Sequence, residues 1–170
     1  MLKNQSIATR IYGVVLTLLV AICVVAFVGL DLAATSNERG RQTYEQSMKP
    51  LQAMGEIAQL MSENRAQIML ALQHDPASPA SRLHDHPVKM HADTLAADRD
   101  KVTALWDSYS RTIDDPEVRK LADAFADARG RYLKEGVQPA LDMILAGNYI
   151  EAQVALLKKI NPLYKEAKEH

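Results

Sequence analysis

The sequence predicts an all-α protein: an antiparallel up-down-up-down four-helix bundle with an N-terminal transmembrane helix continuous with helix one. Three observations predict this class. The 170 residues contain seven glycines and seven prolines, which is few for a β-rich chain with many tight turns. One long uncharged segment lies near the N-terminus. Three short breaks divide the remaining chain into segments whose apolar residues recur at heptad spacing, as in packed helices.

The uncharged segment Ile11–Leu30 is about as long as the 20 apolar residues that a membrane-spanning helix needs. Lys3 and Arg10 precede it, and the first acidic residue, Asp31, follows it. By the positive-inside rule the N-terminus is expected to stay in the cytoplasm and the later chain to be exported. A cleavable signal peptide is the alternative, although its apolar region is normally only about 7–15 residues long. The chain is expected to divide into a cytoplasmic terminus (residues 1–10), a transmembrane helix (11–33) and an exported domain (34–170).

The first helix of the exported domain is expected over residues 34–74, where no turn cluster interrupts the chain. Its apolar residues follow the three- and four-residue spacing of a bundle seam. Pro50 lies inside this helix and is expected to bend it. Two rows are expected to face the core: Leu51, Ala58, Arg65 and Leu72 in one, and Met54, Met61 and Ile68 in the other.

Turn-forming residues are expected to divide the rest of the chain into three more helices. The segment Asp75–Ser81 contains two prolines and ends the first helix. Asp114–Glu117 separates the second helix from the third, because acidic residues and an early proline favour a helix N-terminus. Gly147 and Asn148 separate the third from the fourth, since both tolerate a positive φ. The helices are expected over residues 87–113, 116–146 and 149–169. Their expected inward-facing residues are Val88, Leu95, Val102, Tyr109, Val118, Leu121, Phe125, Ala128, Tyr132, Leu141, Ile144, Leu156, Leu157, Ile160, Leu163 and Tyr164.

Charge and motifs exclude several classes of function. The formal net charge is -1, whereas a nucleic-acid-binding protein needs a basic surface. The chain has no glycine-rich phosphate loop, no H-E-x-x-H and no C-x-x-C-H motif. Its one cysteine, Cys23, lies in the apolar segment and cannot form an internal disulfide. We therefore expect a protein that is not an enzyme and that uses no cofactor.

Arg65 is the most informative polar residue, because its expected row is otherwise apolar. Burying an unpaired charge is costly, so this cation needs a partner. A carboxylate is the natural one, since the planar guanidinium binds both of its oxygens. Two alternatives remain open: an anionic ligand, or a structural ion pair with a carboxylate such as Asp98.

The neighbours of Arg65 complete a candidate ligand-binding site. Asn64 is adjacent, and Met61 and Ile68 lie about one turn away on either side. Ordinary seam packing is the alternative role for Met61 and Ile68. Two residues at the start of the fourth helix are expected to form a second wall. The predicted site consists of Arg65, Asn64, Met61, Ile68, Tyr149 and Gln153.

A histidine-rich segment is a candidate metal site. His84 and His86 flank Asp85, His91 follows near the start of the second helix, and His74 closes the first. Imidazole nitrogens this close in sequence can bind Zn²⁺ or Cu²⁺. The alternative is a solvated loop in which Asp85 or His86 caps the second helix. The predicted metal ligands are His84, His86 and His91.

Several short motifs accompany this plan of one span and four helices. They are Met48-Lys49-Pro50-Leu51, Ser62-Glu63-Asn64-Arg65, the segment Leu145–Ala152, and Asn161-Pro162-Leu163-Tyr164. Together they resemble the four-helix-bundle ligand-binding domain of methyl-accepting chemotaxis proteins, the group that includes the enteric aspartate and serine receptors. The resemblance implies a periplasmic sensor on the bacterial inner membrane that pairs as a homodimer through helix one. It also implies a receptor truncated before its second span, since no second span or cytoplasmic signalling region follows.

By the same resemblance, Arg65 matches one of the arginines that hold a ligand carboxylate in the enteric receptors. The other arginines of that set are missing, because the next turns carry Met69, Leu70, Leu72 and Gln73. The expected function is therefore to bind a small organic anion, a carboxylic acid or amino acid, and to transmit a signal across the membrane. The alternatives are the sensor domain of a histidine kinase or cyclase, and a metal-binding bundle built on the histidine cluster.

Overall fold

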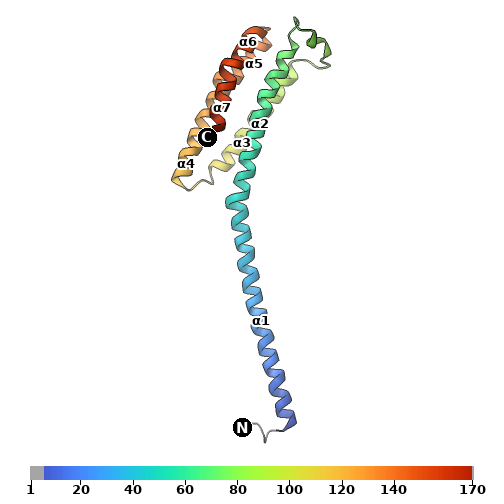
Figure 1. Cartoon of the computed structure of the whole chain (residues 1–170), viewed down its shortest axis with the longest axis vertical. Coiled ribbons are helices and arrows are strands. Elements are labelled where there is room, and N and C mark those ends of the chain that lie inside the picture. The colour runs from blue at the N-terminus through green and yellow to red at the C-terminus, as the bar shows by residue number, and fades with distance from the viewer. Residues whose placement is uncertain (1–5, 170) are drawn as a thin grey trace. The chain divides into compact units, whose positions relative to one another are not determined.

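The computed structural model describes residues 6–169, which form helices joined by short loops and include no strand (Figure 1). The all-α fold class is therefore confirmed. The α-helices are α1 (Ile7–Thr43), α2 (Lys49–Ala71), α3 (Lys89–Ser110), α4 (Pro116–Arg131), α5 (Gln138–Leu145), α6 (Tyr149–Ala155) and α7 (Asn161–Glu169). The π-helical turns are η1 (Tyr44–Met48), η4 (Tyr132–Val137) and η5 (Leu156–Ile160). The 3₁₀ turns are η2 (Leu72–His74) and η3 (Pro79–Leu83). The chain divides into two compact units, Met1–Lys49 and Pro50–His170.

The first unit contains the one helix in the described chain that is long and apolar enough to cross a membrane. The apolar side chains of this helix, α1, are exposed and none is buried within the protein. Ser6 caps α1, because its side-chain oxygen accepts a hydrogen bond from the backbone N–H of Thr9. Lys3, part of the predicted cytoplasmic terminus, lies outside the described residues. The exposed apolar side chains of α1 have the composition that contact with lipid requires.

The second unit is a bundle of four helical arms: α2, α3, α4 with η4 and α5, and α6 with η5 and α7. Figure 1 shows α4 and α5 lying beside α7 and α6, and both pairs are in contact. Arg131 on α4 forms an ion pair with Glu166 on α7 at 2.7 Å. Lys101 on α3 pairs with Glu56 on α2 at 2.6 Å. Because α4 contacts α7 while α5 contacts α6, the third and fourth arms are antiparallel, as expected for an up-down-up-down bundle.

Three prolines inside the helices are each preceded by a π-helical turn. Proline has no N–H, and its ring clashes with the carbonyl four residues earlier, so an α-helix cannot pass through it undisturbed. The residues just before Pro50, Pro139 and Pro162 instead donate their backbone N–H to the carbonyl five residues earlier. The helix therefore continues through each proline by widening one turn.

One of the two predicted inward rows of α2 is confirmed and the other is wrong. The row of Met54, Met61 and Ile68 faces the core as expected. Its partner row is Ile57, Asn64 and Ala71, not Leu51, Ala58, Arg65 and Leu72. Of the predicted partner row only Leu72 is buried, and Leu51 is 74% exposed. The observed register is favoured because it buries Ile57 and a neutral amide, whereas the predicted one would bury a cation.

Three other residues expected to face inward are exposed, namely Val118, Leu121 and Leu157. On α4 the buried face instead carries Ala122, Phe125 and Ala128. Leu157 lies within η5, where the wider turn brings Leu156 and Ile160 to the inner face and turns Leu157 outward. The remaining predicted inward residues are buried or partly buried against the core.

Candidate functional site

Arg65 lies beside the buried row of α2 and is half-buried. Its Nε donates a hydrogen bond to the side-chain oxygen of Asn161 at 2.8 Å. Its guanidinium carbon lies 5.5 Å from the ring centroid of Tyr164, within the range of a cation–π interaction. Both partners are on α7. Within residues 6–169 no carboxylate forms an ion pair with Arg65, so its charge is held among neutral groups.

The π turn before Pro162 positions the partner of Arg65. Asn161 ends η5 and donates its backbone N–H to the carbonyl of Leu156. Its side chain then reaches across to α2. Sequence reasoning missed Asn161 and Tyr164 as contacts of Arg65, because they lie on the fourth arm and no local signal pairs them with it.

The sequence left open an ion pair between Arg65 and Asp98 in place of an anionic ligand. Within residues 6–169 the two side chains form no such pair. One of the carboxylate oxygens of Asp98, Oδ2, is buried and has no hydrogen-bond partner among the described residues. Burial raises the pKa of Asp98 above its ordinary value, and the charge of Glu63 raises it further, while Lys101 opposes both. A poorly solvated carboxylate next to another acid destabilises the folded state.

Asp98→Asn is expected to raise the melting temperature at pH 7. Because the pKa of Asp98 is higher in the folded state, ionisation destabilises the fold, and the cost is fully present only above the folded pKa. The gain should shrink as pH falls and vanish below the unfolded pKa of about 3.9. Melting curves of both chains between pH 4 and 8 test this, with Asp123→Asn on the exposed face of α4 as a control. A gain that is constant with pH would contradict the assignment.

Asn64 belongs to the buried row of α2, where it is 1% exposed. Its side-chain oxygen is buried and has no hydrogen-bond partner within residues 6–169. It lines a cavity of about 250 Å³ whose wall also includes Arg99 and Lys134. The cavity thus combines a buried acceptor with two basic side chains.

Of the other predicted site residues, two are buried in the core beside Arg65 and two lie far from it along the bundle. Met61 and Ile68 are buried in the core, which is the alternative role considered for them. Tyr149 and Gln153 lie on α6, which contacts η2 at the end of α2. At about 1.5 Å per residue, Tyr149 is about 18 Å along the fourth arm from the partner of Arg65. Arg65 and the start of α6 are therefore different places on the bundle.

Arg129 on α4 is a second cation that sequence reasoning missed. Its Nε and Nη1 are buried and, among the described residues, have no hydrogen-bond partner. Burial lowers its pKa, and the charge of Asp107 on α3 opposes that shift. The sequence did not indicate that Arg129 is buried, because Arg129 is not part of an apolar row. It follows the buried Ala128 and lies at the edge of the inward face of α4.

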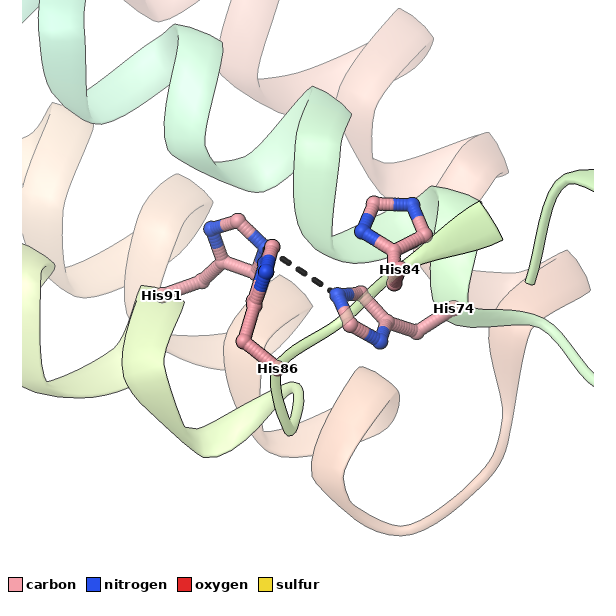
Figure 2. Close-up of side chains that lie close together, drawn as sticks. All are labelled: His74, His84, His86 and His91. Carbon is pink, nitrogen blue, oxygen red and sulfur yellow. Dashed lines mark hydrogen bonds between the residues drawn. The ribbon is translucent and has the colours of Figure 1, made fainter. Parts of the chain in front are cut away.

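Four histidines meet at the end of the bundle where α2 stops and α3 begins (Figure 2). One ring nitrogen from each of His74, His84, His86 and His91 lies within 4.8 Å of the other three. His91 is 3% exposed, and its Nε2 is 3.1 Å from both His74 Nε2 and His86 Nε2. The predicted metal residues are thus brought together, and His74 from the end of the first arm joins them.

The predicted alternative role of this segment, capping of the second helix, is wrong. Val88 is the N-cap residue of α3, and no side chain accepts a hydrogen bond there. Asp85 instead accepts a hydrogen bond from Nδ1 of His86 at 2.9 Å. Burial, followed by the charges of neighbouring histidines, lowers the pKa of His91 and of His74, so both imidazoles favour the neutral form.

A family model described as "Tar ligand binding domain homologue" (TarH) matches residues 1–170. No curated protein and no solved structure matches the chain. The family match extends over the whole sequence, including the apolar N-terminal helix and all four arms of the bundle.

Proposed function

The chain belongs to the family of Tar ligand-binding domain homologues and is a chemoreceptor sensor domain; from this premise we propose that it binds a small organic anion. The ligand class is a carboxylic acid or an amino acid. The site is periplasmic, and the domain is held in the bacterial inner membrane by Ile11–Leu30 with its N-terminus in the cytoplasm. Binding changes the bundle and carries a signal across the membrane.

The observation that supports this ligand class is the surroundings of Arg65. Its Nε is bound by a neutral amide, and its face lies against an aromatic ring. A guanidinium has five N–H donors, so several remain for a ligand. A carboxylate fits them best, because it accepts two parallel hydrogen bonds and neutralises a charge that the protein leaves unbalanced.

A second copy of the chain closes this site in our proposal. On α2, Leu51, Ala58 and Met69 are exposed and lie with Arg65 on one side of the helix, at intervals of seven, seven and four residues that suit a helix–helix seam. Pairing of two chains through this face would cover apolar side chains and place Arg65 at the edge of the interface. Met61 and Ile68 support it from the core side.

Signal transmission in this proposal uses the contact between α2 and α7. A ligand carboxylate that binds the remaining N–H groups of Arg65 shifts the guanidinium relative to Asn161, so binding alters the link between the first and fourth arms. A ligand shifts a conformational balance only by its difference in affinity for the two states. The expected motion is a displacement of the fourth arm by about 1–2 Å along the bundle.

Arg65→Ala is expected to weaken binding of the ligand by about 10- to 100-fold, since a hydrogen bond to a charged group contributes about 1.5–3 kcal/mol. The test begins with a thermal-shift screen of carboxylic acids and amino acids on the full chain in detergent micelles. Calorimetric titration of each hit then compares the unmodified chain with the variant.

Arg99→Ala is the matched control, because Arg99 lines the separate cavity beside Asn64. Loss of binding in Arg65→Ala alone, with its melting temperature retained, supports the proposed site. Unchanged affinity in a folded Arg65→Ala would overturn it. Loss in Arg99→Ala alone would move the site to the Asn64 cavity.

A further inference from the structure

We propose that His74, His84, His86 and His91 form a binding site for a first-row transition-metal dication, with tetrahedral Zn²⁺ as the best fit. This site is separate from Arg65 and does not depend on the anion proposal. It joins the end of the first arm, the loop after it and the first turn of α3. The juxtaposition of four imidazoles from these three segments carries the inference (Figure 2).

The distances between the ring nitrogens match those of a zinc coordination shell. Zinc–nitrogen bonds of about 2.0–2.1 Å place the nitrogens of a regular tetrahedron about 3.3–3.4 Å apart. His91 Nε2 lies 3.1 Å from His74 Nε2 and 3.1 Å from His86 Nε2. The nitrogen of His84 completes a set whose members are all within 4.8 Å of one another. Separations of up to 4.8 Å exceed the tetrahedral spacing by at most about 1.5 Å, a difference that side-chain rotation can close.

Hydrogen bonds on the far side of the rings fix which nitrogen faces the centre. Gln67 donates its amide N–H to Glu63 at 2.7 Å, which leaves its oxygen facing His91 Nδ1 at 2.6 Å. An amide oxygen only accepts, so His91 carries its proton on Nδ1 and directs the lone pair of Nε2 inward. His86 Nδ1 faces the Asp85 carboxylate in the same way. Imidazoles held by an amide or carboxylate on the outer nitrogen are the usual arrangement around protein-bound metals.

The inner nitrogens of three rings lie close together at the centre of the cluster. His86 and His91 each turn Nδ1 toward an oxygen acceptor, and their Nε2 atoms are 3.1 Å apart. His74 Nε2 is also 3.1 Å from His91 Nε2. Since an imidazole nitrogen without a proton carries a lone pair, a cation at this centre could be bound by several rings at once.

The donor set selects the class of metal. Four neutral imidazoles without a coordinating carboxylate or thiolate suit Zn²⁺, Cu²⁺ or Ni²⁺, whereas Mg²⁺ and Ca²⁺ require oxygen ligands. Four protein ligands fill a tetrahedral shell, which is the pattern of structural zinc sites. The bound ion would therefore fasten the loop that contains η3 to the ends of α2 and α3.

The test measures Zn²⁺ binding to the full chain in detergent micelles, purified without a histidine tag, by competition with a fluorescent chelator. We expect one Zn²⁺ per chain, a higher melting temperature with Zn²⁺ but not with Mg²⁺, and the visible absorption of tetrahedral cobalt when Co²⁺ is added. Trypsin cleavage after the exposed Arg82, in η3, should slow when Zn²⁺ is bound.

His86→Gln should weaken Zn²⁺ binding by more than about 100-fold, because loss of a residue that only hydrogen-bonds to a metal ligand already costs about 10- to 100-fold. Gln67→Leu tests that smaller loss, with the exposed Gln59→Leu as its matched control. His170→Gln, which removes the chain's fifth histidine, should bind as the unmodified chain does. His86 is in a loop, so its variant is expected to keep the melting temperature of the metal-free chain.

Zn²⁺ binding that is equally tight in the unmodified chain and in a folded His86→Gln variant would overturn the proposal. So would the absence of Zn²⁺ binding to the unmodified chain, or its loss in His170→Gln alone. None of these results bears on the Arg65 site, which is tested with organic anions in the presence of a chelator.

Discussion

Tyr132→Ala is expected to lower the free energy of unfolding by about 3–5 kcal/mol, the usual cost of removing a large aromatic side chain from a core. Tyr132 is 0% exposed and lies at the centre of the bundle, where the third arm faces the first. Its hydroxyl donates a hydrogen bond to the backbone carbonyl of Met61 at 3.2 Å, and its ring lies 5.8 Å from that of Tyr164. One side chain thus joins three of the four arms.

Thermal unfolding of the full chain followed by circular dichroism measures this loss, with Tyr132→Phe as the matched variant. Tyr132→Phe keeps the ring and removes only the hydroxyl, so it should cost about 0.5–1.5 kcal/mol. Near-equal losses in the two variants would mean that the hydrogen bond, not the packing, carries the stability. A negligible loss in Tyr132→Ala would contradict the central place of this residue in the core.

Gly136→Val is expected to destabilise the bundle by about 1–3 kcal/mol or more, as overpacking of a filled core does. Gly136 lies in η4, and a β-carbon there would come 3.3 Å from Cγ1 of Ile160 and 3.5 Å from its backbone Cα. Two larger branches would force the third and fourth arms apart, because Ile160 is itself fully buried.

Gly130→Val is the control for this prediction, since a β-carbon at Gly130 meets nothing within 4 Å. It should be neutral or slightly stabilising, because valine has a higher helix propensity than glycine by a few tenths of a kcal/mol. The same melting experiment compares the two variants. A Gly136→Val chain as stable as Gly130→Val would show that the arms are not in close contact at this level.

Most of the fold could be predicted from the sequence because its signals are local. Turn residues mark the ends of the arms, and the heptad spacing of Met54, Met61 and Ile68 gives the inward face of α2. The second inward row could not be predicted from the local sequence, since Met54, Met61 and Ile68 can face the core together with either of two neighbouring rows. The choice depends on the cost of burying Arg65 compared with Asn64, and that cost is set by the neighbouring arms.

For the candidate sites, too, only the contacts between residues close in sequence could be predicted. Three of the clustered histidines are near one another in the chain, so their proximity could be predicted. His74 joins them only because the loop after α2 turns back. The contact of Arg65 with Asn161 spans 96 residues and depends on how the first and fourth arms pack. No sequence spacing encodes such a contact.

The widened turns before Pro50, Pro139 and Pro162 also affect how this sequence should be aligned with others. Each holds one residue more than an ordinary α-helical turn, so the inward positions after it recur one residue later. A related chain that lacks one of these prolines has no steric need for the extra residue. Such a chain should carry a one-residue deletion at the corresponding place, and an ungapped comparison would there match core positions of one protein with surface positions of the other.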